Sequence, residues 1–358
     1  MLKPFHIVLT TLGFGLATAF ANPVGFVQTN LASDASDANL VNAWGIAASA
    51  TSPFWLGANG SGTSVLYNGA GAKQALTVTI PGDGSVTGVA FSGVAGAFNG
   101  DAFLFASEDG TVSGWRGALG TTAETLVIAD LNNVYKGLSD ANVGGHEYAY
   151  LANFKSGNVD VMKGDAGAPT LVGNFTDPNL PAGYAPFNVM NLGGSIYVTY
   201  ALRGAGKDDA PGAGHGFVDK YDSNGVLIGR LVTQGALDSP WGLAIAPAGF
   251  GDVGGALLVG NFGDGRINAY NPTTGAFVET LTDANGNPLV IDGLWGLAFG
   301  NGGSAGPTGT LYFTAGPGNE SHGLFGELNP VPEPATWLLS GFSLVGLALR
   351  RARTKLRV

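Results

Sequence analysis

A short phrase, Trp-Gly-Ile/Leu-Ala, occurs three times in this chain, at residues 44–47, 241–244 and 295–298. A looser version, Thr-Gly-Val-Ala, occupies residues 87–90. After a gap, each phrase is followed by an apolar segment, a small polar turn and a second apolar segment. Because glycine adopts positive φ without strain, the glycine-containing turns are typical of β-hairpins. A chain that repeats such a unit is expected to fold as an array of similar sheets.

The clearest hairpins lie at residues 54–67, 103–115, 148–161 and 257–270. Two more degenerate units run from Pro186 to Tyr221 and from Trp295 to Glu327. The units start near Trp44, Gly88, Leu138, Asn188, Trp241 and Trp295. Their length, roughly 44 to 54 residues, is a propeller-type period. No stretch between them keeps the periodicity of a helix.

The sequence therefore predicts an all-β fold, a six-bladed β-propeller of four-stranded blades. The Trp-Gly phrases are expected to form the innermost strands and to line the central channel. Residues 26–31 are expected to add an outer strand to the last blade, which closes the ring and leaves no open edge. A ring of seven blades is the alternative, since one more unit could lie between Leu138 and Trp241.

The C-terminal residues 331–358 form a three-part segment of a different kind. Pro332, Glu333 and Pro334 come first, and an apolar run from Trp337 to Leu349 follows. The basic end contains Arg350, Arg351, Arg353, Lys355 and Arg357. The apolar run is shorter than the about 20 residues that span a bilayer comfortably. The cations after it predict a cytoplasmic end.

This segment resembles the PEP-CTERM sorting signal of Gram-negative bacteria. The resemblance implies transient anchoring in the inner membrane by a short transmembrane helix. It also implies cleavage by an exosortase-type protease and release to the cell surface or surrounding polymer. A plain C-terminal anchor is the alternative, but it would not explain the Pro-Glu-Pro motif.

The N-terminal residues predict export as well. Lys3 and His6 precede an apolar stretch from Ile7 to Phe20, and a small-residue cleavage site ends at Ala21. We expect residues 1–21 to be a signal peptide, residues 22–330 the propeller and residues 331–358 the sorting signal.

The charge of residues 22–330 limits the possible partners. This segment holds ten of the 16 Lys and Arg and 25 of the 26 Asp and Glu, so its net charge is −15. So acidic a surface argues against nucleic acid and anionic lipid as partners, and permits divalent cations. Cysteine is absent, which excludes a disulfide scaffold.

The repeated phrases look like those of NHL-type propellers and of the gluconolactonase and regucalcin-like calcium-dependent hydrolases. Residues 39–47, 53–71 and 211–225 resemble an uncharacterised family of secreted bacterial propellers that often carry PEP-CTERM tails. That resemblance implies the fold and the location, and it implies no established activity.

Asn59, Asn153 and Asn261 recur near the ends of second strands, and Asn188 falls near the inner strand of the fourth unit. One hypothesis places these four side chains around a calcium ion, with an acid such as Asp238 or Asp292. The resemblance to regucalcin-like hydrolases implies such a site at the channel mouth, although no Glu precedes Glu108 here. The other hypothesis is that each Asn caps its own hairpin, which repetition favours.

Other candidate residues give no catalytic pattern. His146, His215 and His322 are scattered, and no nucleophile motif accompanies them. The insertion from Ala201 to Gly216, which contains Asp208, Asp209 and His215, is interpreted as a mobile loop on one face, with a lid or metal clip over the channel as the less favoured alternative. The three repeated Trp could stack on sugars, but packing between blades is the favoured interpretation.

Two functions follow from these observations. The first is a non-catalytic binding protein of the envelope or exopolysaccharide matrix, with a surface polysaccharide or a protein as its ligand. The second is a calcium-dependent extracellular hydrolase, lactonase-like, that uses the channel mouth.

Overall fold

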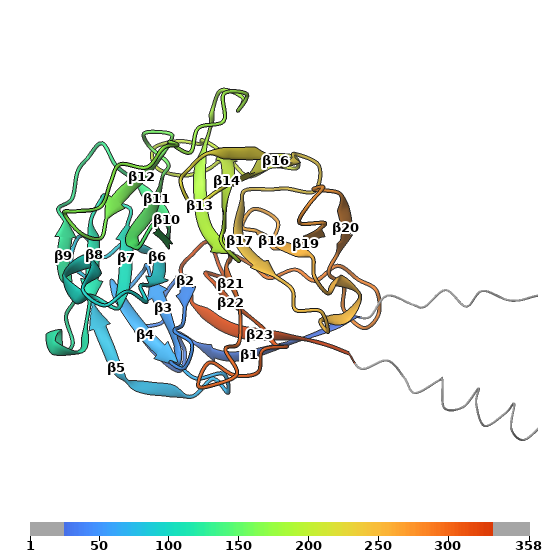
Figure 1. The fold of residues 1–358 in the computed structure, drawn as a ribbon. Helices are drawn as coiled ribbons and strands as arrows, with labels where there is room; N and C mark the ends of the chain where they lie inside the picture. The colour runs from blue at the N-terminus through green and yellow to red at the C-terminus, as the bar shows by residue number, and fades with distance from the viewer. Residues whose placement is uncertain (1–24, 332–358) are drawn as a thin grey trace, which may run out of the picture.

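The computed structural model describes residues 25–331, which form a ring of six β-sheets around a central axis (Figure 1). Five sheets have four strands and the third has three. The predicted six-bladed propeller is confirmed, and the described residues contain no seventh sheet. The predicted signal peptide and sorting segment lie outside the described residues.

Each blade begins with its innermost strand. The first three blades consist of β2 (Ala43–Ala47), β3 (Phe54–Ala58), β4 (Thr63–Tyr67) and β5 (Lys73–Thr79); β6 (Val86–Phe91), β7 (Phe103–Ser107), β8 (Val112–Trp115) and β9 (Glu124–Val127); and β10 (Tyr135–Val143), β11 (His146–Asn153) and β12 (Asn158–Lys163). The next two consist of β13 (Tyr184–Leu192), β14 (Ser195–Leu202), β15 (Gly216–Tyr221) and β16 (Leu227–Thr233); and β17 (Pro240–Ile245), β18 (Leu257–Asn261), β19 (Ile267–Tyr270) and β20 (Phe277–Thr280).

The sixth blade joins the two ends of the described chain. It contains β21 (Leu294–Phe299), β22 (Leu311–Ala315), β23 (Leu324–Pro330) and β1 (Phe26–Ser33). β1 runs antiparallel to β23, with Phe26 opposite Pro330. The predicted closing strand is therefore confirmed, and each blade has a neighbour on both sides (Figure 1).

The third blade differs from the others in its outer part. After β12 the chain contains no strand from residue 164 to residue 183. The Phe175 ring packs between Tyr150 and Tyr221, at centroid distances of 4.8 and 5.4 Å. The N–H groups of Gly173 and Phe175 donate to carbonyl oxygens of the fourth blade, at Asn224 and Gly225. This segment therefore fastens the third blade to the fourth without adding a strand.

The inner strands share a three-residue pattern where their pairing register shifts. The triplets are Trp44-Gly45-Ile46, Thr87-Gly88-Val89, Lys136-Gly137-Leu138, Phe187-Asn188-Val189, Trp241-Gly242-Leu243 and Trp295-Gly296-Leu297. A Cβ on Gly88 would lie 2.4 Å from the backbone N of Leu138 in the next blade, and one on Gly242 2.6 Å from the carbonyl O of Trp295. Glycine therefore allows neighbouring inner strands to approach around the axis.

Buried apolar residues fill the interfaces between successive blades, and a further cluster lies on the axis. In the axial cluster the Trp44 and Trp295 rings stack at 3.6 Å, and Trp241 lies edge-on to both at 6.3 and 5.8 Å. The three Trp come from the first, fifth and sixth blades and pack on one another at the axis, in agreement with the expected packing between blades.

The helices within residues 25–331 are the short turns Ala97–Gly100, Gly117–Leu119 and Gly251–Val253. None of them has the length and apolar character needed to cross a membrane.

Candidate ligand-binding site

The axial aromatic cluster divides the central channel into two cavities. Trp44 and Trp295 border one cavity, whereas Ile46 and Leu297, two residues further along the same strands, border the other. The first cavity, which we call the charged pocket, has a volume of about 510 Å³. It is lined by Asn42, Trp44, Asn59, Gly60, Glu108, Lys136, Lys207, Asp208, Asp209, Pro211, Phe262, Trp295 and Glu320.

The second cavity, which we call the apolar channel, has a volume of about 580 Å³ and is lined mainly by apolar side chains of the inner strands. Loops between first and second strands border it, at Ala48 and Gly193, whereas loops between second and third strands border the charged pocket, at Asn59 and Glu108. Because these loops lie at opposite ends of antiparallel strands, the two cavities face opposite sides of the ring.

Glu108 joins two lysines in the wall of the charged pocket. Its Oε1 lies 2.5 Å from Nζ of Lys136, and its Oε2 lies 2.6 Å from Nζ of Lys207. Burial tends to raise the pKa of Glu108, but the charges and hydrogen bonds of Lys136 and Lys207 outweigh it and hold that pKa below its usual value. Lys136 is buried and lies 5.1 Å above the Trp44 ring. This wall is therefore ionised and fixed in position.

Asn42 connects Trp295 of the axial aromatic cluster to Glu320 in the wall of the charged pocket. Its Oδ1 accepts a hydrogen bond from Nε1 of Trp295 at 3.1 Å, and its Nδ2 donates to Oε2 of Glu320 at 2.7 Å. Nδ2 also approaches Oδ1 of Asn59 at 3.4 Å. These bonds fix the orientation of the Asn42 amide and leave Nδ2 of Asn59 free to bond elsewhere.

Two further carboxyl groups of the charged pocket take up protons more readily than usual. Burial raises the pKa of Glu320, against the hydrogen bond from Asn42. Burial also raises the pKa of Asp209. The pocket therefore combines an ionised Glu108 with two carboxyl groups that can donate or accept a hydrogen bond.

Three buried polar atoms of residues that line the charged pocket have no hydrogen-bond partner among the described residues. They are Nε1 of Trp44, Nδ2 of Asn59 and Oδ2 of Asp209, although the nearby Ser239 hydroxyl group interacts with the Asp209 carboxyl group and lowers its pKa. Because a buried polar group without a partner costs about 1–3 kcal/mol, such atoms normally bond to something. Trp44 and Asn59 offer donors, and Asp209 offers an oxygen.

The insertion between β14 and β15 brings the fourth blade over the charged pocket. Lys207 reaches Glu108 of the second blade, and Asp208, Asp209 and Pro211 complete that side of the wall. The backbone N–H of Gly212 donates to Oδ1 of Asp238 at 2.7 Å. The insertion is therefore held at Lys207 by Glu108 and at Gly212 by Asp238. Its position at the wall of the charged pocket fits the interpretation as a lid better than that as a mobile loop.

The three histidines lie at separate places. His146 and His322 pair with Asp165 and Asp34 at 2.8 and 2.9 Å, and Nδ1 of His215 lies 2.8 Å from the carbonyl O of Ala210. None of them lines the charged pocket.

Asn153 and Asn261 occupy matching positions, opposite the residue that precedes the inner-strand triplet. Oδ1 of Asn153 accepts from the N–H groups of Val134 and Ser156, at 3.2 and 3.1 Å. Nδ2 of Asn261 donates to the carbonyl O of Ala236 and to Oδ1 of Asp264, at 2.8 and 3.0 Å. These bonds tie the second strand to adjacent loops, and neither residue lines the charged pocket.

Asn188 and Asn59 lie elsewhere. Asn188 takes the glycine position of the fourth triplet, and its Nδ2 donates to the carbonyl O of Trp241 at 2.8 Å. Asn59 follows β3, so it lies one residue beyond the position of Asn153 and Asn261. Successive residues of a strand face opposite sides, and Asn59 alone among the four borders the charged pocket.

The structure therefore does not gather the four Asn in one pocket. Asp238 borders the insertion, and Oδ2 of Asp292 accepts from the N–H of Gly318 at 2.9 Å. Within residues 25–331 no group of three or more acidic or histidine side chains has the geometry of a metal site. The calcium hypothesis stays a prediction.

Sequence reasoning missed Glu108, Lys136 and Lys207 as members of one site. Lys136 could have been found, because it stands at the axial position that Trp occupies in three of the other triplets. The meeting of Glu108 with Lys207 could not, because 99 residues separate them in sequence.

A family model for the PEP-CTERM protein-sorting motif matches residues 330–353. The match confirms the motif predicted at Pro332, Glu333 and Pro334 and indicates export and sorting to the cell surface or extracellular space. It also implies processing by exosortase.

Solved structures with a similar fold include a glucose dehydrogenase, with 13% identity, a TM-score of 0.53 and coverage of 86% of this chain and 100% of that one. Another is virginiamycin B lyase from Staphylococcus aureus, with 11% identity, a TM-score of 0.50 and coverage of 86% and 99%. At such identities the likeness shows the fold alone.

The fold and the sorting motif define a secreted-type six-bladed β-propeller. Two proteins of Acanthamoeba polyphaga mimivirus resemble it along most of the chain. Uncharacterized protein R648 is 31% identical over 292 residues, 76% of this chain and 71% of the relative. Uncharacterized protein L690 is 31% identical over 320 residues, 82% of this chain and 81% of the relative. The chain belongs to the family of these proteins.

Proposed function

We propose that this protein is a non-catalytic binding protein of the cell surface or exopolysaccharide matrix. In this proposal the charged pocket holds a hydroxyl-rich ligand, such as a sugar unit of a surface polysaccharide. The observation that carries the proposal is the set of buried atoms without partners at Trp44, Asn59 and Asp209. A hydroxyl group both donates and accepts hydrogen bonds, so one polyhydroxylated ligand matches the two donors and the oxygen.

The remainder of the charged pocket suits a neutral ligand. Glu108 is paired with both Lys136 and Lys207, Asp208 supplies a second negative charge, and Asn42 already bonds to Glu320. An anion would meet Asp208 and, where they are ionised, Asp209 and Glu320, and these carboxylates repel it. Because these partners are fixed before binding, the pocket orders few side chains when it takes up a ligand.

Export positions the pocket outside the cell. In this proposal residues 1–21 are removed as a signal peptide, and the apolar run from Trp337 to Leu349 holds the chain transiently in the inner membrane. Exosortase then cuts near the Pro332-Glu333-Pro334 motif, and residues 22–330 reach the surface polymer.

Binding is tested by calorimetry with the oligosaccharides of the native exopolysaccharide. Trp44→Phe removes the indole N–H and keeps an aromatic ring. A net hydrogen bond of about 1 kcal/mol predicts a roughly fivefold rise in Kd. Asn59→Asp keeps the size of the side chain and exchanges a donor for an acceptor, so it should weaken binding at least as much.

Trp115→Phe is the matched control, because the Trp115 N–H is already bonded to the carbonyl O of Gly120 in the second blade. It should leave the Kd unchanged. Equal affinities in Trp44→Phe, Asn59→Asp and wild type would contradict the proposal, as would the absence of saccharide binding.

The alternative is a calcium-dependent extracellular hydrolase. The raised pKa values of Glu320 and Asp209, beside the ionised Glu108, favour it, since carboxyl groups in different protonation states serve acid and base roles. Turnover of a sugar lactone that is lost on chelation and in Glu320→Gln would favour the hydrolase over the binding protein.

A further inference from the structure

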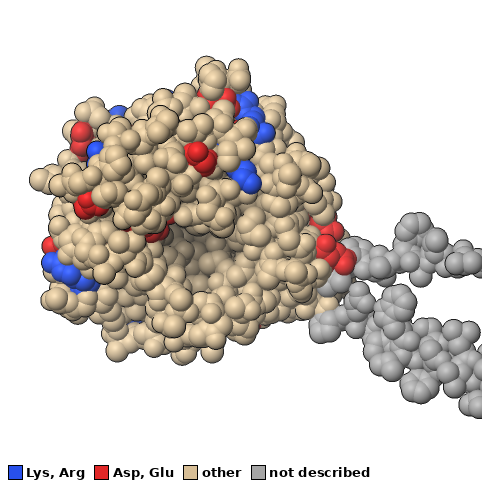
Figure 2. Space-filling view, viewed as in Figure 1, with Lys and Arg blue, Asp and Glu red and all other residues tan. Residues whose placement is uncertain are grey.

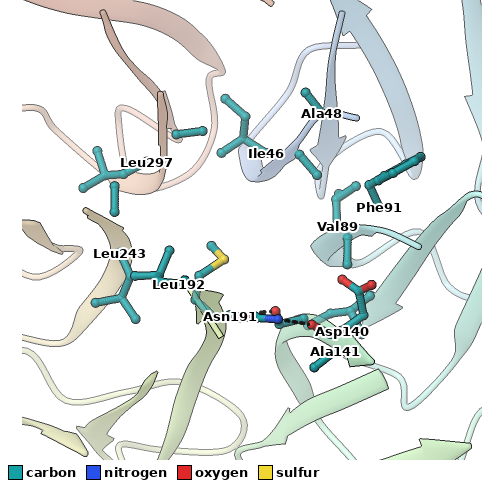
Figure 3. A pocket seen from close by; sticks show the side chains of 18 of the residues that line it. Ile46, Ala48, Val89, Phe91, Asp140, Ala141, Asn191, Leu192, Leu243 and Leu297 are labelled. Carbon is teal, nitrogen blue, oxygen red and sulfur yellow. Dashed lines mark hydrogen bonds between the residues drawn. The ribbon is translucent and has the colours of Figure 1, made fainter. Parts of the chain in front are cut away.

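The apolar channel lies on the other side of the aromatic cluster from the charged pocket. All six inner strands contribute to its wall, and Figure 3 shows Ile46, Val89, Leu243 and Leu297 around the space. Its volume of about 580 Å³ lies in the range of small-molecule sites, about 300–1,000 Å³. Figure 2 shows one face of the ring, hollowed at its centre and with few charged side chains around the hollow.

Two carboxyl groups are the only charged groups that line the apolar channel among the described residues. Asp140 of β10 borders the space, as Figure 3 shows. Glu147 of β11 also lines the channel, within hydrogen-bonding reach of the Asp140 side chain. Glu147 is only 3% exposed. Its Oε2 accepts a hydrogen bond from Nδ2 of Asn142 at 3.2 Å. Neither carboxyl group takes part in an ion pair within residues 25–331.

Buried carboxylates normally have a cationic partner, because an unpaired charge in an apolar environment is costly. Glu108 in the charged pocket has two such partners, whereas the buried Glu147 and the partly exposed Asp140 have none. The other side chains of the wall are apolar or, at Ser139, Asn142 and Asn191, polar and uncharged, so none of them can supply the missing positive charge.

We propose that the apolar channel is a second binding site, which takes an organic ammonium ion with an apolar body. The ammonium group lies against Asp140 and Glu147, and the apolar body lies along the side chains of the inner strands. Ligand binding in the apolar channel is independent of the ligand in the charged pocket, because the two cavities lie on opposite sides of the Trp44 and Trp295 rings.

The protonation of the pair links ligand binding to pH. Burial, and then Glu147, raise the pKa of Asp140 to about 8. Near neutral pH Asp140 of the empty channel therefore holds a proton. A bound ammonium ion favours the doubly ionised pair, so binding releases that proton to the solvent, and affinity rises with pH up to about 8.

The neighbouring titratable groups are few. β11 carries His146, which pairs outward with Asp165, and Tyr150, whose hydroxyl group donates to the carbonyl O of Ser223. The inner strands β2, β6, β13, β17 and β21 contribute no titratable side chain to the channel wall. The proton released on binding is therefore assigned to Asp140.

Three probes of equal length test the charge requirement on the wild-type, full-length chain: octylammonium, octanol and octanoate, each below its micelle concentration. We expect octylammonium to bind about tenfold more tightly than octanol, and octanoate more weakly than both. Calorimetry in two buffers of different ionisation enthalpy at pH 7 should show proton release. Equal Kd values for octylammonium and octanol, no binding of either, or no proton release would overturn the proposal.

Asp140→Asn and Glu147→Gln keep the shape of the pair and remove one charge each. Each should weaken octylammonium binding about tenfold and leave octanol binding unchanged. Glu279→Gln is the matched control, because Glu279 lies in the outer strand β20. It should leave both Kd values unchanged. Equal loss of octylammonium and octanol binding in Asp140→Asn would indicate structural damage and would count against the proposed ion pair.

Discussion

At the residue scale, Asn153 and Asn261 decide between a shared metal ion and local structure. Asn153→Ala removes an acceptor from the N–H groups of Val134 and Ser156. We expect it to lower the free energy of unfolding by about 1–3 kcal/mol, since buried groups lose their partners. Asn261→Ala should cost about 1 kcal/mol through Ala236 and Asp264.

Urea unfolding with calcium and with a chelator checks this prediction. Local bonding predicts that the two losses add in the double variant and that calcium changes neither. A shared ion predicts that calcium stabilises the wild type alone. A midpoint that shifts with calcium in wild type and not in either variant would therefore restore the metal hypothesis.

The sequence could show that Asn recurs near the ends of second strands, but not what each amide contacts. Asn59 and Asn153 look equivalent in the sequence because each follows an apolar strand. Their register differs by one residue, and this places Asn59 alone in the charged pocket. A difference of one residue is invisible until the strands are paired.

At the element scale, the glycine of the inner-strand triplet controls how closely blades approach. A Cβ on Gly88 would lie 2.4 Å from the backbone N of Leu138. Gly88→Ala should therefore lower the free energy of unfolding by about 1–3 kcal/mol, because the inner strands of the second and third blades must separate. Gly229→Ala in β16 has open space around its Cβ and should be neutral or slightly stabilising.

Urea unfolding of both variants measures the difference. Similar midpoints for Gly88→Ala and Gly229→Ala would show that the close approach of β6 and β10 does not limit the packing of the ring.

Elements were predictable where their pattern repeats. The inner strands, their hairpins and the closing strand β1 all follow from short periodic phrases. The three strands of the third blade could not be predicted in this way. The segment from residue 164 to residue 183 is held by the Phe175 ring and by backbone hydrogen bonds to the fourth blade. Such contacts have no local sequence pattern.

At the scale of the whole molecule, the ring gathers buried acids that the linear sequence scatters. Each blade contributes a residue to the charged pocket, and each inner strand contributes to the apolar channel. Composition gave the net charge of −15 for residues 22–330 but not its distribution. Closure of the ring buries several acids in places where their protonated form is favoured, so the stability of the fold depends on pH.

Burial raises the pKa of Asp140 to about 8, of Asp219 to about 7 and of Asp101 to about 6. The unfolded chain has ordinary Asp values of about 3.9. Between these values the folded protein binds more protons, so its stability falls as pH rises from about 4 to about 8. Asp34 and Asp37 have lowered pKa values and lose their contributions below pH 4.

The melting temperature should therefore be highest at about pH 4–5 and should decrease steadily to about pH 8, the reverse of a protein limited by acid denaturation. Asp140→Asn keeps the shape of the side chain and removes its titration, so it should flatten the decrease between about pH 6 and 8. Asp283→Asn is the matched control. Hydrogen bonds from the backbone and side chain of Asn287 lower the pKa of Asp283, so its contribution is lost only in acid. A melting temperature that rises from pH 5 to 8 would show that Asp101, Asp140 and Asp219 do not retain their protons in the folded ring.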